Sequence, residues 1–366
     1  MTRPRVGIVG AGQLGRMLAL AGYPLGVDCT LLDSGADAPG AQVAACVVGA
    51  LGDPAALAEL ADRVDVVTLE IENVDVAALE SLRERIDVFP PPQAVAAAQD
   101  RLAEKTLFRS LDIPTAPFVT IDSTADAARA ETLGWPAVLK TRRMGYDGRG
   151  QRVVDSAAAL AAAWRELGSV PSIAEAFVAF DREVSLIGVQ GAGGERVFYP
   201  LAENVHSGGI LASTIAPYDD ARLQKQAERW LTAIMSKLEY RGVLTVEFFH
   251  TKSGLVANEM APRVHNSGHW TIEGAATSQF ENHLRAVLGW PLGDPTARGH
   301  AAMLNLLGRL PPRDAVLRIP GAHLHDYGKS PRNGRKVGHC TLVDLERARL
   351  LARLEPLKDV VFRSNQ

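Results

Sequence analysis

Two carboxylates that local spacing brings together are the first candidates for chemistry in this chain. The segments GVLTVEFF and LVANEM, within residues 242–260, predict two strands, because they are short, apolar and separated by the turn-forming HTKSG. A hairpin closed by this turn places Glu247 beside Asn258 and Glu259. Carboxylate and amide oxygens suit a Mg²⁺ ion that carries substrate phosphates. The hairpin alone is equally compatible with a solvated strand that bears two scattered acids.

A polar run directly after the second strand favours the functional interpretation. It contains Arg263, His265, Asn266, Ser267 and His269. Loops that leave a core strand with many polar side chains are frequent sites of function. We therefore predict that residues 242–270 form part of an active site.

A glycine-rich loop supplies a second candidate. Residues 135–140 predict a strand ending in Lys140, and residues 152–154 predict a return strand. The loop between them, Thr141–Gln151, contains three glycines, but GxxxxGK[ST] is absent. Glycines allow backbone N–H groups to approach phosphates closely, and Lys140 adds a positive charge. The pattern predicts a flap over phosphates, with a mobile surface hairpin as the alternative.

The N-terminus carries a third pattern. A buried-type strand at Val6–Val9 runs into GAGQLG, and Asp33 follows 18 residues after the last glycine of that motif. Strand, GxGxxG, helix and acid form the dinucleotide-binding fingerprint. The pattern leaves open a nicotinamide or flavin cofactor, another phosphate ligand, or a scaffold. Glu70 and Glu72 end a further strand at the edge where such sheets bind ligands, although either acid could cap the next turn.

Periodicity predicts the remaining elements. Helices are expected at Ala94–Leu111, Ala221–Leu238 and Gln279–Leu288, and strands at Cys29–Leu32, Ala45–Val48, Val64–Ile71, Ser172–Val178, Ala301–Leu307, Val316–Ile319 and His323–His325. His206 ends a predicted strand, where a lone His is more often structural than catalytic. The basic segment Gly328–His339 predicts a hairpin that reaches towards an anion.

Length and charge limit the classes of function. A chain of 366 residues is expected to form two or three domains. Its net charge of −3 argues against a nucleic-acid binder. Residues 1–97 carry 6 basic and 13 acidic side chains, whereas residues 298–366 carry 13 and 6. The basic C-terminal part is therefore expected to dock against the acidic N-terminal part or against an anionic small molecule.

Cysteine usage and hydropathy predict a location. Cys29, Cys46 and Cys340 are odd in number and widely spaced, which argues against disulfides and a zinc site. No apolar run reaches 18 residues, and MTRPRVGIVG enters a strand without an apolar leader. We expect a cytoplasmic protein that does not bind membranes.

Five motifs together resemble one family. GAGQLGRM, KTRRMGYDGRGQ, YPLAENVHSGGIL, NEMAPRVHNSGHWT and GRKVGH are similar to motifs of the N5-carboxyaminoimidazole ribonucleotide synthetases, ATP-grasp enzymes of purine synthesis. The likeness runs nearly end to end. It implies an α/β and α+β ATP-grasp fold with a Rossmann-like N-terminal domain at residues 1–97. The ATP-grasp domain would span residues 98–297, with a mobile lid at about 112–178, and a small β-rich C-terminal domain would span residues 298–366.

The resemblance also implies a reaction. ATP, bicarbonate and aminoimidazole ribonucleotide would give the N5-carboxy product, ADP and phosphate through carboxyphosphate, with ATP and Mg²⁺ as cofactors. It implies a homodimer and an N-terminal domain that binds no dinucleotide. A formate-dependent glycinamide ribonucleotide transformylase of the same fold is the main alternative. A dinucleotide oxidoreductase would explain GAGQLG but would leave the flap and the hairpin without a role.

Site residues follow from the matching motif positions. The resemblance implies that ATP is held by Arg101, Lys140, Gly145, Tyr146, Asp147, Gly148, Arg149, Gly150, Gln151, Glu175, Val178, Glu183, His206, Asn258 and Glu259. It implies that Glu247 and Glu259 bind Mg²⁺, and that the ribonucleotide contacts Gly12, Gln13, Glu72, Tyr146, Arg149, Arg335 and Lys336. The catalytic candidates are Asp147, Arg263, His265 and Lys336.

Two further expectations concern single positions. The planar fork of Arg263 would pair with bicarbonate, and His265 would donate to its third oxygen, which formate lacks. Met144 stands where relatives often carry a second glycine, so a positive φ there would strain the flap.

Overall fold

The structure is a computed structural model that describes residues 3–145 and 148–364. Its N-terminal part is a parallel four-stranded sheet with the order β3-β2-β1-β4. The strands are β1 (Arg5–Val9), β2 (Asp28–Asp33), β3 (Ala45–Val48) and β4 (Val66–Leu69), and the helices are α1 (Gln13–Gly22), α2 (Pro54–Arg63) and α3 (Val76–Arg83). All four predicted strands are confirmed, β4 in a shorter form than Val64–Ile71.

The single helix predicted over Ala94–Leu111 is wrong. Two helices, α4 (Pro92–Gln99) and α5 (Arg101–Ser110), meet at Asp100, whose backbone is extended. The Asp100 carboxylate caps α5 by accepting from the backbone N–H of Leu102 at 3.0 Å, and it also pairs with Arg142 at 2.6 Å. Because Asp is a favoured N-cap residue, Asp100 ends α4 and begins a new helix, α5.

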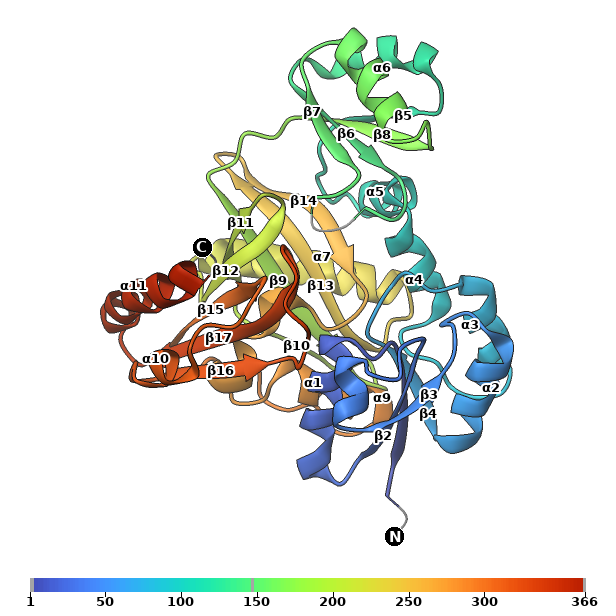
Figure 1. The fold of residues 1–366 in the computed structure, drawn as a ribbon. Coiled ribbons are helices and arrows are strands. Elements are labelled where there is room, and N and C mark those ends of the chain that lie inside the picture. Colours follow the sequence, from blue (N-terminus) through green and yellow to red (C-terminus); the bar gives the residue numbers. More distant parts are fainter. Residues whose placement is uncertain (1–2, 146–147, 365–366) are drawn as a thin grey trace.

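A small antiparallel sheet follows, which we call the lid. Its order is β5-β8-β6-β7, from β5 (Phe118–Ile121), β6 (Ala137–Thr141), β7 (Gln151–Val154) and β8 (Ser172–Ala176). The 3₁₀ segment Thr124–Leu133 and α6 (Ala157–Glu166) pack on it around Leu139 and Leu160. Figure 1 shows the lid standing apart from the main body, at the top of the view.

The centre of the molecule is a nine-stranded antiparallel sheet. Its order is β14-β13-β9-β11-β12-β15-β17-β16, with β10 paired to β9. The strands are β9 (Arg182–Gln190), β10 (Arg196–Phe198), β11 (Ala202–Ser207), β12 (Ile210–Ala216), β13 (Gly242–Thr251), β14 (Gly254–Ala261), β15 (His300–Leu307), β16 (Ala322–Asp326) and β17 (Lys336–Asp344). The helices α7 (Ala221–Lys237), α8 (Thr271–Gly274) and α9 (Gln279–Leu288) lie between them in sequence.

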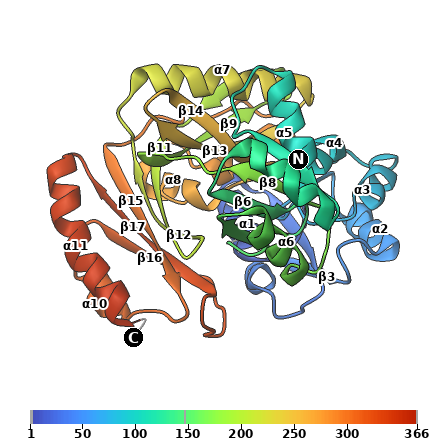
Figure 2. The same cartoon turned by 90° about the horizontal axis from the view of Figure 1, so that it is seen from above.

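The C-terminal strands therefore continue the central sheet. The strand predicted at Val316–Ile319 is wrong, because this region contains the helix α10 (Arg313–Leu317), which starts after Pro312 and carries the i,i+4 pair Asp314–Arg318. A long final helix, α11 (Arg347–Ser364), was not expected. Figure 2 shows α10 and α11 beside β15–β17, on the side away from the N-terminal sheet.

One apolar core joins the N-terminal sheet to the central sheet. Ile8 and Leu18 pack in the same cluster as Trp270 and Phe280. This shared core fixes the glycine loop near the loop that follows β14. In the part of the chain that the structure describes, no helix combines the length and the apolarity needed to cross a membrane.

Candidate active site

The two carboxylates of the hairpin face each other across paired strands. Glu247 of β13 is in register with Glu259 of β14, beside a β-bulge at Glu247–Phe248. Burial raises the pKa of Glu247 to about 7, and the negative charge of Glu259 adds to this effect. Burial also acts on Glu259, but the charge of Arg101, whose Nη1 lies 3.0 Å from Oε2, outweighs it and lowers the pKa to about 2. The predicted proximity of the two acids is confirmed.

These acids line a cavity of about 640 Å³. Within residues 3–145 and 148–364, no three His, Cys, Asp or Glu side chains form a cluster that could hold a metal ion. A divalent cation between Glu247 and Glu259 would therefore need further oxygens from a ligand. Mg²⁺ is often held in this way, by one or two carboxylates and substrate phosphates.

The predicted site residues divide into three sets. The cavity is lined by Gln13, Glu72, Arg101, Gly145, His206, Glu247, Glu259, Arg263, His265 and Lys336. Gly12, Lys140, Gly148, Arg149, Gly150, Gln151, Glu175, Val178, Glu183, Asn258 and Arg335 are not part of that lining. Tyr146 and Asp147 lie outside the described residues.

Lys140 belongs to a charge cluster at the base of the lid. Its Nζ lies 2.8 Å from Oε2 of Glu175 and 3.3 Å from Oδ1 of Asn258. The other oxygen of Glu175 lies 3.2 Å from Nζ of Lys105, which also donates to the carbonyl of Asn258 at 2.7 Å. Although burial opposes it, the charges of Lys140 and Lys105 lower the pKa of Glu175 to about 2. The cluster thus connects the lid to β14.

Lys105 and Glu104 are site residues that sequence reasoning missed. Both are buried, and the Glu104 carboxylate accepts from the backbone N–H of Met260 at 2.6 Å. Burial raises the pKa of Glu104 to about 8. Together with Arg101 they lie at positions i, i+3 and i+4 of α5, so one helix face contacts β14. The sequence pattern that could have predicted these residues is three charged side chains at that spacing, directly after an N-cap Asp.

The flap reaches across to the turn between β11 and β12. A Cβ placed on Gly148 would come within 2.9 Å of the Cα of Gly209, so the two backbones are in close contact. Gly148 has a φ of +73° and Gly150 one of +71°. Met144 also adopts the left-handed conformation, with a φ of +62°, and its side chain is exposed. The positive φ suspected at this position is therefore present.

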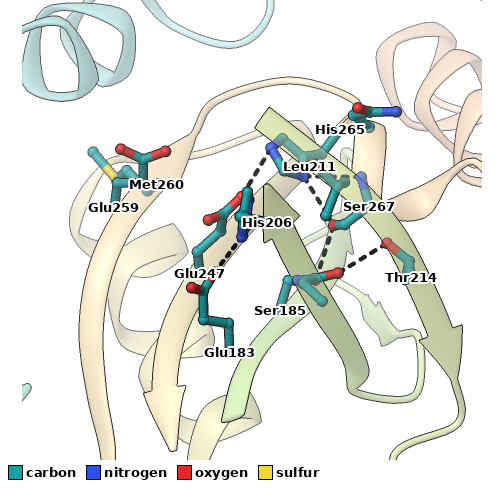
Figure 3. A network of polar contacts seen from close by, with 12 residues as sticks. Glu183, Ser185, His206, Leu211, Thr214, Glu247, Glu259, Met260, His265 and Ser267 are labelled. Atoms are coloured by element: carbon teal, nitrogen blue, oxygen red, sulfur yellow. Dashed lines mark hydrogen bonds and ion pairs between the residues drawn. The ribbon is translucent and has the colours of Figure 1, made fainter. Parts of the chain in front are cut away.

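Two histidines contact carboxylates at the cavity. His206 contacts Glu183, and Nε2 of His265 lies 3.3 Å from Oε1 of Glu247 (Figure 3). Burial and the positive charge of Arg263 lower the pKa of His265 to about 3, so its ring is neutral. For His206, burial is outweighed by the hydrogen bond with Glu183, which raises its pKa.

Arg263 already has a partner for its fork. Nε contacts Oε2 of Glu72, and Nη2 donates to Oε1 at 2.9 Å. Nη1 donates to the carbonyl of Val264 at 3.1 Å. In this structure the Nε and Nη2 donors of Arg263, which were expected to bind bicarbonate, are bonded to the Glu72 carboxylate instead.

The glycine loop of the N-terminal sheet is also occupied. The Glu70 carboxylate accepts from the N–H groups of Gly12 at 2.7 Å and Gly15 at 2.8 Å, and Asp33 accepts from Ala11 at 3.0 Å. In dinucleotide-binding proteins, such N–H groups receive the pyrophosphate. The carboxyl group of Glu70 therefore takes the place of a phosphate at this position. The loop serves to hold Gln13 at the cavity wall.

The basic hairpin meets Gln13 from the other side. Lys329 contacts the side chain of Gln13, and Lys336 lines the cavity. Burial and the charge of Arg335 lower the pKa of Lys329 to about 8. Of the two partners expected for the basic C-terminal part, this contact shows the N-terminal part, through a neutral side chain; the anionic small molecule stays a prediction. Lys329 was not among the predicted site residues.

Three family models match consecutive parts of the chain. They are a ribonucleotide synthetase preATP-grasp domain over residues 3–99, an ATP-grasp domain over residues 106–280, and a phosphoribosylaminoimidazole carboxylase C-terminal domain over residues 301–353.

Known proteins of similar sequence and structure bear one kind of name. The N5-carboxyaminoimidazole ribonucleotide synthase of Pseudomonas aeruginosa is 48% identical over 358 residues, covering 98% of this chain and 99% of that protein. The N5-carboxyaminoimidazole ribonucleotide synthetase from Thermus thermophilus superposes with a TM-score of 0.94 at 51% identity, covering 97% and 98% of the two chains. The N5-carboxyaminoimidazole synthase from Aspergillus clavatus, in complex with ADP and 5-aminoimidazole ribonucleotide, superposes with a TM-score of 0.92 at 33% identity, covering 99% of each chain.

Proposed function

The chain belongs to the N5-carboxyaminoimidazole ribonucleotide synthases, which are ATP-grasp ligases, and we propose that it joins bicarbonate to the amine of 5-aminoimidazole ribonucleotide at the expense of ATP. The products are N5-carboxyaminoimidazole ribonucleotide, ADP and phosphate. Formyl transfer to glycinamide ribonucleotide, the alternative that the sequence left open, is disfavoured by the names of these relatives.

One observation carries the proposal. A single cavity of about 640 Å³ is lined by an acidic pair on the central hairpin, by Arg263 and His265 directly after it, and by Gln13 and Lys336 from the two ends of the chain. A reaction that joins a nucleoside triphosphate, a small acid and a ribonucleotide needs three adjacent subsites with different charges. This cavity brings side chains of both charges together, and Lys140 lies beside it, bonded to Asn258 next to Glu259.

Glu247 and Glu259 fit the role of magnesium ligands. They are hard-oxygen donors, they are adjacent across β13 and β14, and their mutual repulsion is part of what raises the pKa of Glu247. When bound, Mg²⁺ would neutralise the phosphate charge that opposes the approach of an anionic nucleophile. Asn258 is held by Lys140 beside this pair.

The residues of this chain then divide the work. Lys140 and Arg101 would place the triphosphate, and the backbone of the flap would cover it. Carboxyphosphate, formed when bicarbonate takes the γ-phosphoryl group, is labile in water, so a covered cavity protects it. Asp147 is the candidate to accept the proton of the attacking amine. Gln13, Glu72, Arg149, Arg335 and Lys336 would contact the ribonucleotide.

The Glu72–Arg263 pair refines the bicarbonate subsite. Because Nε and Nη2 of Arg263 are bonded to Glu72, bicarbonate would meet a fixed positive charge rather than a free fork. The neutral ring of His265 remains a donor, with its Nε2 near Glu247. Discrimination against formate by His265 would then require its Nε2–H to exchange Glu247 for the third oxygen of bicarbonate, which formate lacks.

Assembly, location and lid motion belong to the same proposal. We expect a homodimer in the cytoplasm, with domain limits near residues 97 and 297 and a lid at about 112–178 that closes on ATP. The lid meets β14 through the Lys105–Glu175–Lys140 cluster. Closure of the lid on ATP would therefore change the contacts of this cluster.

An omission assay tests the proposed function. Phosphate release from ATP is measured with bicarbonate and 5-aminoimidazole ribonucleotide together, and then with each left out. We expect full turnover only in the complete mixture, because positioning of all three substrates completes the site. Turnover with formate and glycinamide ribonucleotide, but none in the complete mixture, would refute the proposal.

The strained flap gives a separate prediction. Met144 holds a φ of +62°, which costs an L residue about 1 kcal/mol that glycine does not incur. Met144→Gly is therefore expected to lower the KM for ATP by up to about fivefold, if the strained loop is the ATP-binding conformer. Met144→Val, which is β-branched, is expected to raise the KM. Equal KM values in the three proteins would show that this conformer is not the one that binds ATP.

A further inference from the structure

A buried chain of hydrogen bonds runs from the central sheet to His265. Thr214 of β12 donates to Oδ1 of Asn204 of β11 at 2.9 Å, and Nδ2 of Asn204 donates to Oγ of Ser185 of β9 at 2.9 Å. Ser185 donates to Oγ of Ser267 at 2.8 Å, and Oγ of Ser267 lies 2.8 Å from Nδ1 of His265. Figure 3 shows Thr214, Ser185, Ser267 and His265 to the right of Glu183 and Glu247.

The direction of these bonds fixes the tautomer of His265. An amide NH₂ can only donate, so Ser185 accepts from Asn204 and passes its own proton towards Ser267. The backbone N–H of Ser267 donates to Nδ1 of His265 at 3.2 Å, which makes Nδ1 an acceptor. The hydroxyl of Ser267, 2.8 Å from the same atom, is therefore placed to donate to it as well. With Nδ1 an acceptor, the proton of a neutral ring lies on Nε2, which faces Glu247 at 3.3 Å.

Core packing does not explain these residues. Ser185, Asn204, Thr214 and Ser267 are at most 4% exposed, at positions where an apolar side chain would avoid the cost of burying polar groups. This series of hydrogen bonds also begins on three neighbouring strands and ends at one ring, that of His265. Such a fully paired polar network specifies one arrangement of its members.

The hydrogen-bond series can orient the ring of His265 but is not needed to hold its backbone. The backbone of His265 is already held by Gln279, whose Oε1 accepts from the N–H at 3.0 Å and whose Nε2 donates to the carbonyl at 2.6 Å. Gly268 is packed so closely that a Cβ there would come within 2.4 Å of Ile187. The remaining freedom is rotation and tautomerisation of the imidazole.

We propose that Ser267, supported by Ser185 and Asn204, is a positioning residue for the ring of His265. It holds this ring with its Nε2–H directed into the proposed bicarbonate subsite beside Glu247. This inference rests on the proposed function, because it assigns His265 a donor role towards bicarbonate. Ser267 itself need not touch a substrate. Its effect passes through the ring, and the effect of each supporting residue weakens with its distance from that ring.

The kinetic test uses a graded series with a matched control. Ser267→Ala is expected to lower kcat about tenfold with an unchanged KM for ATP, as loss of a partner that orients a functional His commonly does. Ser185→Ala should lower kcat less, by about threefold, because Ser267 keeps its proton. The control is Ser172→Ala in the lid, which removes an equally buried hydroxyl that donates to the carbonyl of Val170 at 2.8 Å. It should match the wild type.

A spectroscopic measurement makes the test independent of activity. Histidine ring ¹⁵N–¹H spectra of the wild type should show His265, assigned with His265→Gln, as a single Nε2–H tautomer. In Ser267→Ala, and not in Ser172→Ala, these signals should broaden or split. An unchanged His265 signal, or a kcat for Ser267→Ala equal to that of the control, would overturn the inference. A wild type that fails to carboxylate the ribonucleotide would instead refute the proposed function.

Discussion

Replacing Glu247 by Gln is expected to lower kcat by about a thousandfold while leaving the fold intact. Removing one of the two proposed anionic ligands of Mg²⁺ would withdraw roughly 4 kcal/mol of stabilisation from the transition state. Glu259→Gln should lower kcat at least as much, because Arg101 also loses the carboxylate that lies 3.0 Å from its Nη1. The comparison of the two variants separates the metal from the arginine, since the carboxylate that pairs with Arg101 is that of Glu259, whereas Glu247 contacts His265.

The control for these variants lies on the same sheet. Glu203→Gln on β11 removes a carboxylate that pairs with Arg182 at 2.9 Å and does not line the cavity. It should keep wild-type turnover. Thermal unfolding of all three variants should stay within a few degrees of the wild type. Wild-type kcat in Glu247→Gln and Glu259→Gln at saturating Mg²⁺ would remove both residues as metal ligands.

Lys140→Met is expected to reduce kcat/KM for ATP by about a hundredfold or more. Met keeps much of the length of the side chain but removes the charge that would face the triphosphate, and catalysis of phosphoryl transfer depends on such positioning and charge. The fold should tolerate the change, because Glu175 keeps its ion pair with Lys105 at 3.2 Å. Steady-state kinetics with varied ATP measure the effect.

A second lysine provides the comparison. Lys252 lies exposed in the turn between β13 and β14, so Lys252→Met changes the net charge equally without touching the cavity. Its kcat/KM should equal that of the wild type. Similar values for the two variants would mean that Lys140 supports only the lid and not the nucleotide.

The acid pair was predictable because its determinants are local. A short turn and two apolar runs set the register that puts Glu247 opposite Glu259. The flap followed in the same way from its glycines and flanking strands. The break at Asp100 was not predicted, since its cause includes Arg142, a partner 42 residues away.

Other features depend on contacts that no local pattern encodes. Glu72 and Arg263 are 191 residues apart, and only the assembled fold places one against the other. The burial of Lys105 beside Glu175 likewise depends on how the lid meets β14. The segment at Val316–Ile319 looked like a strand by composition, but the prolines before it and the Asp314–Arg318 pair favour a helical turn. Local sequence patterns therefore predicted the pairing of the two acids, but not the distant partners that hold the surrounding charged groups.

The most direct test of the account is the fate of labelled bicarbonate. The protein is incubated with ATP, Mg²⁺, 5-aminoimidazole ribonucleotide and labelled bicarbonate, and acid-labile label in the product is compared with phosphate released. A parallel mixture contains labelled formate and glycinamide ribonucleotide. The account predicts one labelled carboxyl group per phosphate in the first mixture and none in the second. Label incorporated only from formate would contradict it.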